Sequence, residues 1–401
     1  MSAPNQQSET IQSKGSGRTG WYVAAAVVVV VIIALAALYA LNDLGNPKPS
    51  KKVAGACTSF TILGAGSTFV QGLMTAWTTS GGYPTNTVDY AAVGSGTGIS
   101  DITTKTVAYG ASDAPLNSTQ AAAAPGLLTM PETAGAVAVI FNLPSSVVFP
   151  LHDSLNLTGS VLAAIYLGTI SWWNNSAITS LNPGVTLPVA QIAVYHRSDG
   201  SGTSYAFTQF LSDSNTTWKN TIGYSTLPAW PHTPLGGGEK GSSIIAGTVK
   251  ETTDSIGYVD LGYAAENQIA YAAVENPSSK NIIPTVPDTA SAIADVLATT
   301  NLPAGSASWS AVSMIDASGA GDYPIATLSY MLFYQKADQN PLILSSGDAA
   351  AFANFLNWTV NDGQTYAGAL YYIPLPLAVV TADEATIASM TYNGNAIPAC
   401  T

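Results

Sequence analysis

Short apolar stretches and amphipathic stretches alternate along most of the chain, which is the pattern of an α/β protein. Residues 60–63 are apolar, a glycine-rich turn follows, and the apolar residues within 69–78 recur at helical spacing. Further strands are expected at residues 88–93, 107–111, 134–142 and 192–196, and further helices are expected from residue 99 and over residues 204–211. Because strand ends repeatedly meet helix starts, we expect α/β lobes built on mostly parallel sheets.

One apolar stretch is much longer than the others. Residues 21–41 form an uninterrupted apolar run, long enough at about 1.5 Å per residue to cross a hydrocarbon core of about 30 Å. The polar residues 1–20 precede it, and residues 42–56 combine Pro, Gly and Lys without apolar periodicity. We predict an N-terminal tail at 1–20, a single-pass transmembrane signal anchor at 21–41, a linker at 42–56 and an extracytoplasmic globular part. A cleaved signal peptide is the alternative.

Length and charge restrict the class of protein. At 401 residues the chain is too long for one ordinary core, so two lobes are expected. Charged residues make up 9% of the chain and the formal net charge is -12, with Lys and Arg scattered singly. No nucleic-acid partner is therefore expected, and an anionic ligand would have to be held by local geometry.

Cysteine and histidine usage says little about chemistry. The two cysteines, Cys57 and Cys400, stand at the two ends of the globular part, which in an oxidising compartment predicts a disulfide; two unrelated thiols are the alternative. The three histidines have no metal-ligand spacing, so no metal site and no cofactor are expected. Sequons that would make the chain a glycoprotein in a glycosylating host occur at Asn117, Asn156, Asn174, Asn215 and Asn357.

Three segments share one design: GAGST at 64–68, GSGTG at 94–98 and DGSGTS at 199–204. Each follows an expected strand and opens an expected helix, so backbone N–H groups converge where the positive end of the helix dipole points. One such turn usually only caps a helix, but three in one chain predict an anion-binding site. The stretch GGGEKGSS at 236–243 has no strong strand before it, and we interpret it as a surface loop or lip of a lobe.

Two charged residues lie beside these turns. Arg197 precedes the third turn and is the only arginine after Arg18; a guanidinium suits a tetrahedral oxyanion, and Asp199 could hold it in place. The alternative is a surface ion pair. Asp113 follows an expected strand, and a carboxylate near an anion site fits a ligand that carries a proton. The alternative for Asp113 is a turn-capping role.

With these motifs in order, the chain resembles the phosphate-binding protein of the bacterial and archaeal phosphate-specific ABC transporter. The matching stretches are GAGSTF, VGSGTG, YGASDAPL, IYLGTISWWNNSAITSLNPGVTLP, HRSDGSGTS and IGYVDLGYA, which cover about residues 57–275. The resemblance implies a two-lobed α/β fold of the periplasmic-binding-protein type, with a ligand cleft between the lobes. It also implies capture of inorganic phosphate, delivery to the permease subunits of an ABC importer, and no enzymatic activity.

The resemblance further implies which residues bind phosphate. They come from the three turns and the neighbouring strand ends: Ser67, Thr68, Phe69, Ser95, Asp113, Arg197, Asp199, Ser201, Gly202 and Thr203. Asp113 would accept the phosphate proton, Arg197 would pair with the phosphate while bonded to Asp199, and the others would supply hydroxyl and backbone donors. Two departures stand out: the second turn is not the GSSGG-like form common in the family, and His196 stands where a second arginine is frequent.

The turns lie on both sides of the expected strand at 134–142. We therefore predict a first lobe of residues 57–137 and 275–401 and a second lobe of residues 138–274.

The rival functions are a binding protein for another oxyanion such as sulfate or molybdate, a phosphatase-like or serine-hydrolase enzyme using Ser67 or Ser201, and a surface adhesin. A nucleophile elbow needs Gly-x-Ser-x-Gly, and Ser201 lacks the first glycine.

Overall fold

The computed structural model describes residues 60–79, 82–84, 87–149 and 154–399. Contacts divide the chain into two units, Met1–Asn46 and Pro47–Thr401, and the described residues all belong to the second unit. The expected membrane span at 21–41 and both cysteines lie outside these ranges, so the anchor and the disulfide stay predictions. Within the described ranges no helix is both long and apolar enough to cross a membrane.

An eight-stranded sheet organises the described chain. Its strand order is β2-β1-β3-β11-β4-β8-β6-β7. The strands are β1 (Ile62–Gly66), β2 (Val88–Ala92), β3 (Tyr109–Ser112), β4 (Leu127–Asn142), β6 (Ala193–Arg197), β7 (Leu235–Glu239), β8 (Ser255–Asp260) and β11 (Ala326–Tyr334). Neighbours are parallel at both ends of the sheet, but β11 and β4 are antiparallel to every strand beside them. The expectation of mostly parallel sheets is therefore wrong at the centre.

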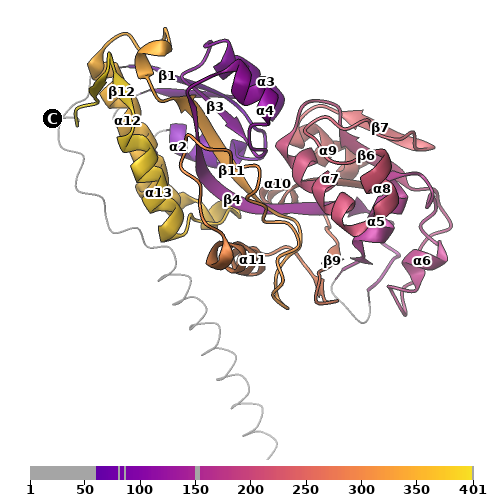
Figure 1. Ribbon diagram of the computed structural model, residues 1–401. Coiled ribbons are helices and arrows are strands. Elements are labelled where there is room, and N and C mark those ends of the chain that lie inside the picture. Colours follow the sequence, from indigo (N-terminus) through magenta and orange to yellow (C-terminus); the bar gives the residue numbers. More distant parts are fainter. Residues whose placement is uncertain (1–59, 80–81, 85–86, 150–153, 400–401) are drawn as a thin grey trace, which may run out of the picture. The chain divides into compact units, whose positions relative to one another are not determined.

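The long strand β4 belongs to both halves of the sheet (Figure 1). Its residues 127–131 and 133–136 pair with β11, and residues 137–142 pair with β8. Every residue of β4 except the last is buried, which fits a strand covered on both faces. The sequence predicted only residues 134–142 of this strand, because Pro131 and Glu132 interrupt the apolar pattern on which the prediction relied.

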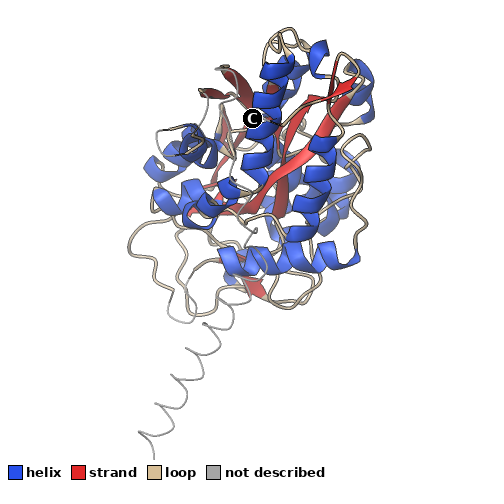
Figure 2. Ribbon diagram, turned by 90° about the vertical axis from the view of Figure 1, so that its left-hand side faces the viewer, coloured by secondary structure: helices blue, strands red, loops and turns tan. Residues whose placement is uncertain are grey.

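The first lobe contains β2, β1, β3, β11 and the part of β4 that pairs with β11. Its helices and short 3₁₀ turns are α2 (Gln71–Thr78), α3 (Ser95–Thr103), α4 (Ser118–Ala123), α11 (Val286–Thr299), η1 (Ala337–Gln339), α12 (Ser346–Val360), η2 (Asp362–Tyr366), η3 (Gly368–Leu370) and α13 (Leu377–Ala388). A small hairpin of β12 (Thr391–Tyr392) and β13 (Asn395–Ala396) follows. Figure 2 shows that helices flank the strands on both sides.

The second lobe contains β8, β6, β7 and the rest of β4. Its helices are α5 (Gly159–Tyr166), α6 (Ser176–Thr179), α7 (Gly202–Ser214), α8 (Thr216–Thr221), α9 (Ser242–Glu251) and α10 (Leu261–Glu266). A separate three-stranded sheet joins β5 (Asn156–Leu157), β9 (Ala273–Glu275) and β10 (Asn281–Ile282). The fold is therefore the two-lobed α/β arrangement that the alternating sequence pattern predicted.

Aromatic packing fixes the strand that carries Arg197. The Tyr258 ring stacks on Phe207, with 4.4 Å between ring centroids. Its hydroxyl accepts a hydrogen bond from the Arg197 N–H at 3.0 Å and lies 2.6 Å from the Ser204 Oγ. The end of β6 and the start of α7 are thereby tied to one buried hydroxyl, which sets the direction in which the Arg197 side chain leaves the strand.

Candidate functional site

The turns singled out from the sequence meet between the two lobes. The Gly96 N–H of the second turn donates to the Gly200 carbonyl oxygen of the third turn at 2.9 Å. The Gly202 N–H donates to the Ser95 Oγ, also at 2.9 Å. A Cβ atom on Gly202 would lie 2.5 Å from the Cβ of Asp113, closer than real Cβ contacts come. Glycine at this position is therefore what lets the two lobes approach.

Arg197 is the charged centre of the site. Its side chain is 2% exposed, and it donates to both carboxylate oxygens of Asp199, from Nε at 2.7 Å and from Nη2 at 2.5 Å. Burial alone would raise the pKa of Asp199, but the hydrogen bonds and charge of Arg197 outweigh it and lower that pKa. The remaining nitrogen, Nη1, donates across the lobes to the Thr68 Oγ1 at 3.0 Å and reaches the Ser242 Oγ at 3.4 Å. Asp199 therefore fixes the guanidinium with one edge facing the first lobe.

Ser242 is a residue that the sequence did not identify. Residues 235–239 pair with β6 as strand β7, Gly241 caps α9 with a φ of 81°, and Ser242 is the first residue of that helix. Its Oγ lies 2.9 Å from the Thr68 Oγ1. Residues 236–240 are exposed or half-buried, as expected of a surface segment, but they are not a loop. The loop prediction is wrong because glycines carry no strand signal and the pairing with β6 decides the conformation.

Asp113 lies buried at the end of β3 with both carboxylate oxygens engaged. Oδ2 accepts from the Ser67 hydroxyl at 2.7 Å, and Oδ1 accepts from the Ser329 hydroxyl at 2.8 Å. Burial raises the pKa of Asp113 to about 6, and the hydroxyls of Ser67 and Ser329 and the charge of Arg197 limit the rise. Ser67 itself accepts from the Phe69 N–H at 3.0 Å, so Phe69 holds the hydroxyl that donates to Asp113. Asp113 is therefore mostly ionised at neutral pH.

Two buried hydroxyls keep a hydrogen that no described acceptor takes. The Ser95 Oγ accepts from the N–H groups of Gly202 at 2.9 Å and Asp113 at 3.4 Å, which leaves its O–H free to donate. The Thr203 side chain is 1% exposed, and its Oγ1 has no partner among the described residues. Ser201 accepts within α7 as its N-cap. Buried hydroxyls without an acceptor are unfavourable, so these two hydroxyls are suited to donate to an oxyanion.

Glu132 is a second residue that the sequence did not identify. It lies on β4, fully buried, with Oε1 2.9 Å from the Ser329 Oγ. Burial raises its pKa to about 8; the Ser329 hydrogen bond lowers it and the charge of Asp113 raises it further. One signal could have found it, since it is the single charged residue in residues 127–142.

The predicted ligand-binding residues thus form one buried cluster. Two of its hydrogen bonds cross between the lobes, from the Arg197 Nη1 to the Thr68 Oγ1 and from the Gly202 N–H to the Ser95 Oγ. Within the first lobe, hydrogen bonds join Ser67, Phe69, Ser95 and Asp113. His196 points elsewhere and stacks on Trp230, with 4.6 Å between centroids. Ser67 faces a carboxylate and not an imidazole, and no metal-binding group of three acids, histidines or cysteines occurs in the part of the chain that the structure describes.

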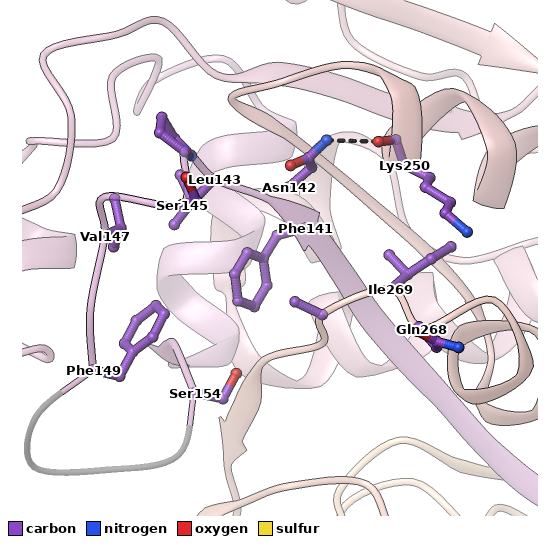
Figure 3. Close-up of a pocket in the computed structure, with 12 residues that line it drawn as sticks. Phe141, Asn142, Leu143, Ser145, Val147, Phe149, Ser154, Lys250, Gln268 and Ile269 are labelled. Atoms are coloured by element: carbon purple, nitrogen blue, oxygen red, sulfur yellow. Dashed lines mark hydrogen bonds between the residues drawn. The ribbon is translucent and has the colours of Figure 1, made fainter.

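A pocket of about 390 Å³ lies at the other end of β4 (Figure 3). Phe141, Val147 and Phe149 give it apolar walls. Its one cationic side chain, Lys250, donates from Nζ to the Asn267 carbonyl oxygen at 2.8 Å. The pocket therefore lacks the buried guanidinium of the site between the lobes.

Comparison with known proteins agrees with this geometry. Residues 51–362 match the PBP superfamily domain. A solved structure of the phosphate-binding protein from Stenotrophomonas maltophilia shares the fold, with a TM-score of 0.64, 20% identity and coverage of 84% of this chain and 97% of that one. The fold and the matched residues thus define a two-lobed protein of the PBP superfamily.

Closer relatives narrow the family. The phosphate-binding protein PstS of Xylella fastidiosa is 35% identical over 337 residues, which are 82% of this chain and 86% of the relative. The PstS of Pasteurella multocida is 35% identical over 326 residues, covering 81% and 89%. The chain belongs to the PstS family of phosphate-binding proteins within the PBP superfamily.

Proposed function

We propose that this chain captures inorganic phosphate between its two lobes as the extracytoplasmic solute-binding protein of an ABC-type phosphate importer. The observation that carries the proposal is the buried Arg197 guanidinium, held by Asp199 and facing hydroxyl groups of both lobes. A buried guanidinium whose inward edge meets only neutral hydroxyls is a strong partner for a tetrahedral oxyanion. Family membership supports the same ligand.

Each group around the ligand has a distinct role in this proposal. Arg197 supplies the positive charge, and the free hydroxyl hydrogens of Ser95 and Thr203 donate to phosphate oxygens. Asp113 accepts the proton that phosphate keeps near neutral pH. Sulfate keeps no proton and would place bare negative charge against this carboxylate, so Asp113 selects for phosphate.

The surroundings of the binding domain are also part of the proposal. The lobes would comprise residues 57–137 with 275–401 and residues 138–274. The change of β4 from β11 to β8 as partner between residues 136 and 137 supports the first of these boundaries. Residues 21–41 would anchor the chain in the membrane, and permease subunits of the importer would receive the phosphate. No turnover of phosphate esters is expected.

The Arg197 assignment is tested by replacing this residue with alanine and titrating the full chain with phosphate. Removing one partner of a buried charge pair costs about 2–5 kcal/mol, so we expect the dissociation constant to rise about 30-fold or more. Lys280→Ala is the matched control, because it removes a positive charge from an exposed position and should bind like wild type. Equal phosphate affinity in Arg197→Ala and wild type would refute the assignment.

A further inference from the structure

Glu132 sits in a β-bulge that opens toward the site. On the paired strands β11 and β4, Ser329 lies opposite Thr133 and Tyr330 lies opposite Pro131, so Glu132 has no partner residue on β11. A bulge inserts one extra residue into a strand and re-aims its side chain. Here the re-aimed carboxyl reaches the Ser329 hydroxyl, which is also a partner of Asp113.

The Ser329 hydroxyl lies between the carboxyl groups of Asp113 and Glu132 and contacts both. The Ser329 Oγ lies 2.8 Å from the Asp113 Oδ1 and 2.9 Å from the Glu132 Oε1, both hydrogen-bond distances. A serine hydroxyl has one hydrogen, so it can donate to only one of the two. If both carboxyl groups were ionised, the Ser329 oxygen would face one carboxylate oxygen with no hydrogen between them, which is repulsive in a buried place. One carboxyl must therefore carry a proton and donate to Ser329.

The surroundings decide which carboxyl carries that proton. Asp113 has a second hydroxyl donor in Ser67 and is stabilised as an anion by the charge of Arg197. The Glu132 Oε2 is buried and has no hydrogen-bond partner within the described chain. An ionised carboxylate would leave that oxygen unsolvated, which is unfavourable. The pKa values agree, since burial raises that of Glu132 to about 8 and that of Asp113 only to about 6.

The other titratable groups that face Glu132 do not compete for this role. Besides Asp113, they are Tyr90 of β2 and Tyr109 of β3. Burial first, and then the charge of Glu132, raise the pKa of both tyrosines well above their ordinary value, so both stay neutral. Between neutral pH and about pH 9.5, Glu132 is therefore the group here whose charge changes.

We propose that Glu132 is a positioning residue for phosphate binding: its proton turns the Ser329 hydroxyl toward Asp113 and keeps a second negative charge out of the site. The inference rests on the proposed function. Glu132 contacts Ser329. It therefore acts indirectly, through Asp113, which accepts the hydrogen bond from the phosphate proton.

A dependence of affinity on pH follows from this arrangement. The bound state keeps the proton on Glu132, while in the free protein Glu132 ionises as the pH rises through its pKa of about 8. Above that pH, phosphate binding must take up a proton. The affinity should then fall by up to tenfold for each pH unit, because each further unit lowers the protonated fraction of the free protein tenfold.

The test is to titrate the full chain with inorganic phosphate from about pH 7 to about pH 9.5, in wild type and in Glu132→Gln. Glutamine keeps the shape and can donate its N–H to Ser329, but it cannot ionise. We expect the wild-type affinity to fall above about pH 8 and the Glu132→Gln affinity to stay level. Glu251→Gln, which removes an exposed carboxylate, should keep the wild-type profile.

The outcomes separate this inference from the proposed function. Parallel pH profiles of wild type and Glu132→Gln would overturn the role of Glu132 while leaving phosphate binding intact. Absence of phosphate binding by wild type at every pH would overturn the proposed function and this inference with it. If Glu132→Gln does not fold, calorimetry of wild type near pH 8.5 in buffers of different ionisation heat decides. We expect proton uptake of up to about one per phosphate, and no uptake would overturn the inference.

Discussion

Asp113 lies at the end of β3, and each of its carboxylate oxygens already accepts one hydroxyl hydrogen bond. Both hydroxyls belong to the first lobe, so the carboxylate is fixed before any ligand arrives. A fixed acceptor can bind a protonated oxyanion but repels one without a proton. Selectivity between ions of similar size and shape can therefore come from a single residue.

Replacing Asp113 with asparagine tests whether this residue gives selectivity for phosphate over sulfate. The amide removes the negative charge and offers an N–H₂ donor, so sulfate should gain more affinity than phosphate loses. Competition titrations with phosphate and sulfate at one pH and ionic strength measure the change. Asp101→Asn, on α3, is the control for a general loss of charge and should keep the wild-type preference. A variant that excludes sulfate as strongly as wild type would make Asp113 a turn residue.

Local motifs revealed some of the site residues and could not reveal others. Arg197 and Asp199 are two positions apart, and Asp113 follows a strand, so their roles could be read from short segments. Ser329 lies 216 residues from Asp113 in the sequence and meets it only because β11 enters the sheet beside β3. Glu132 likewise depends on a bulge set by strand pairing. Contacts of this range are not encoded in a local pattern.

At the scale of elements, the site is built from repeated strand–turn–helix units. Three were predicted from their Gly/Ser turns, and their helices α2, α3 and α7 follow those turns in the structure. A fourth unit, β7 with α9, was missed because three of the five residues of its strand are glycine. The apolar pattern predicts a strand where apolar residues mark it. It does not predict a strand such as β7, which is extended only because it pairs with a neighbouring strand.

A contact between helices of opposite lobes gives a prediction at this scale. The Tyr263 hydroxyl of α10 donates to the Gln71 Oε1 of α2 at 2.7 Å. If the lobes open to release phosphate, this bond breaks, so Tyr263→Phe should destabilise the closed state by about 0.5–1.5 kcal/mol. Phosphate release in stopped-flow experiments should then be about 2- to 12-fold faster.

The control for this variant is Tyr224→Phe, which removes a hydroxyl from a tyrosine that is 48% exposed on the second lobe. It should release phosphate at the wild-type rate. A Tyr263→Phe rate equal to that of Tyr224→Phe would show that the bond between α10 and α2 does not hold the lobes together.

At the scale of the whole molecule, a chain of net charge -12 is proposed to bind an anion. Charges on its surface are screened over about 8 Å at physiological ionic strength, so they need not prevent binding at a buried guanidinium. Length and alternation predicted two lobes, but not that one sheet runs through both by way of β4. That continuity depends on which strands pair, and the order of elements along the chain does not determine it.

The most direct test of the account is a crystal structure of the chain grown with phosphate. We expect tetrahedral density between the lobes, bonded to the Arg197 guanidinium and to the hydroxyls of Ser95 and Thr203, with one phosphate oxygen within hydrogen-bond distance of the Asp113 carboxylate. Phosphate bound elsewhere, such as in the pocket beside Phe141, with no density at Arg197, would contradict it.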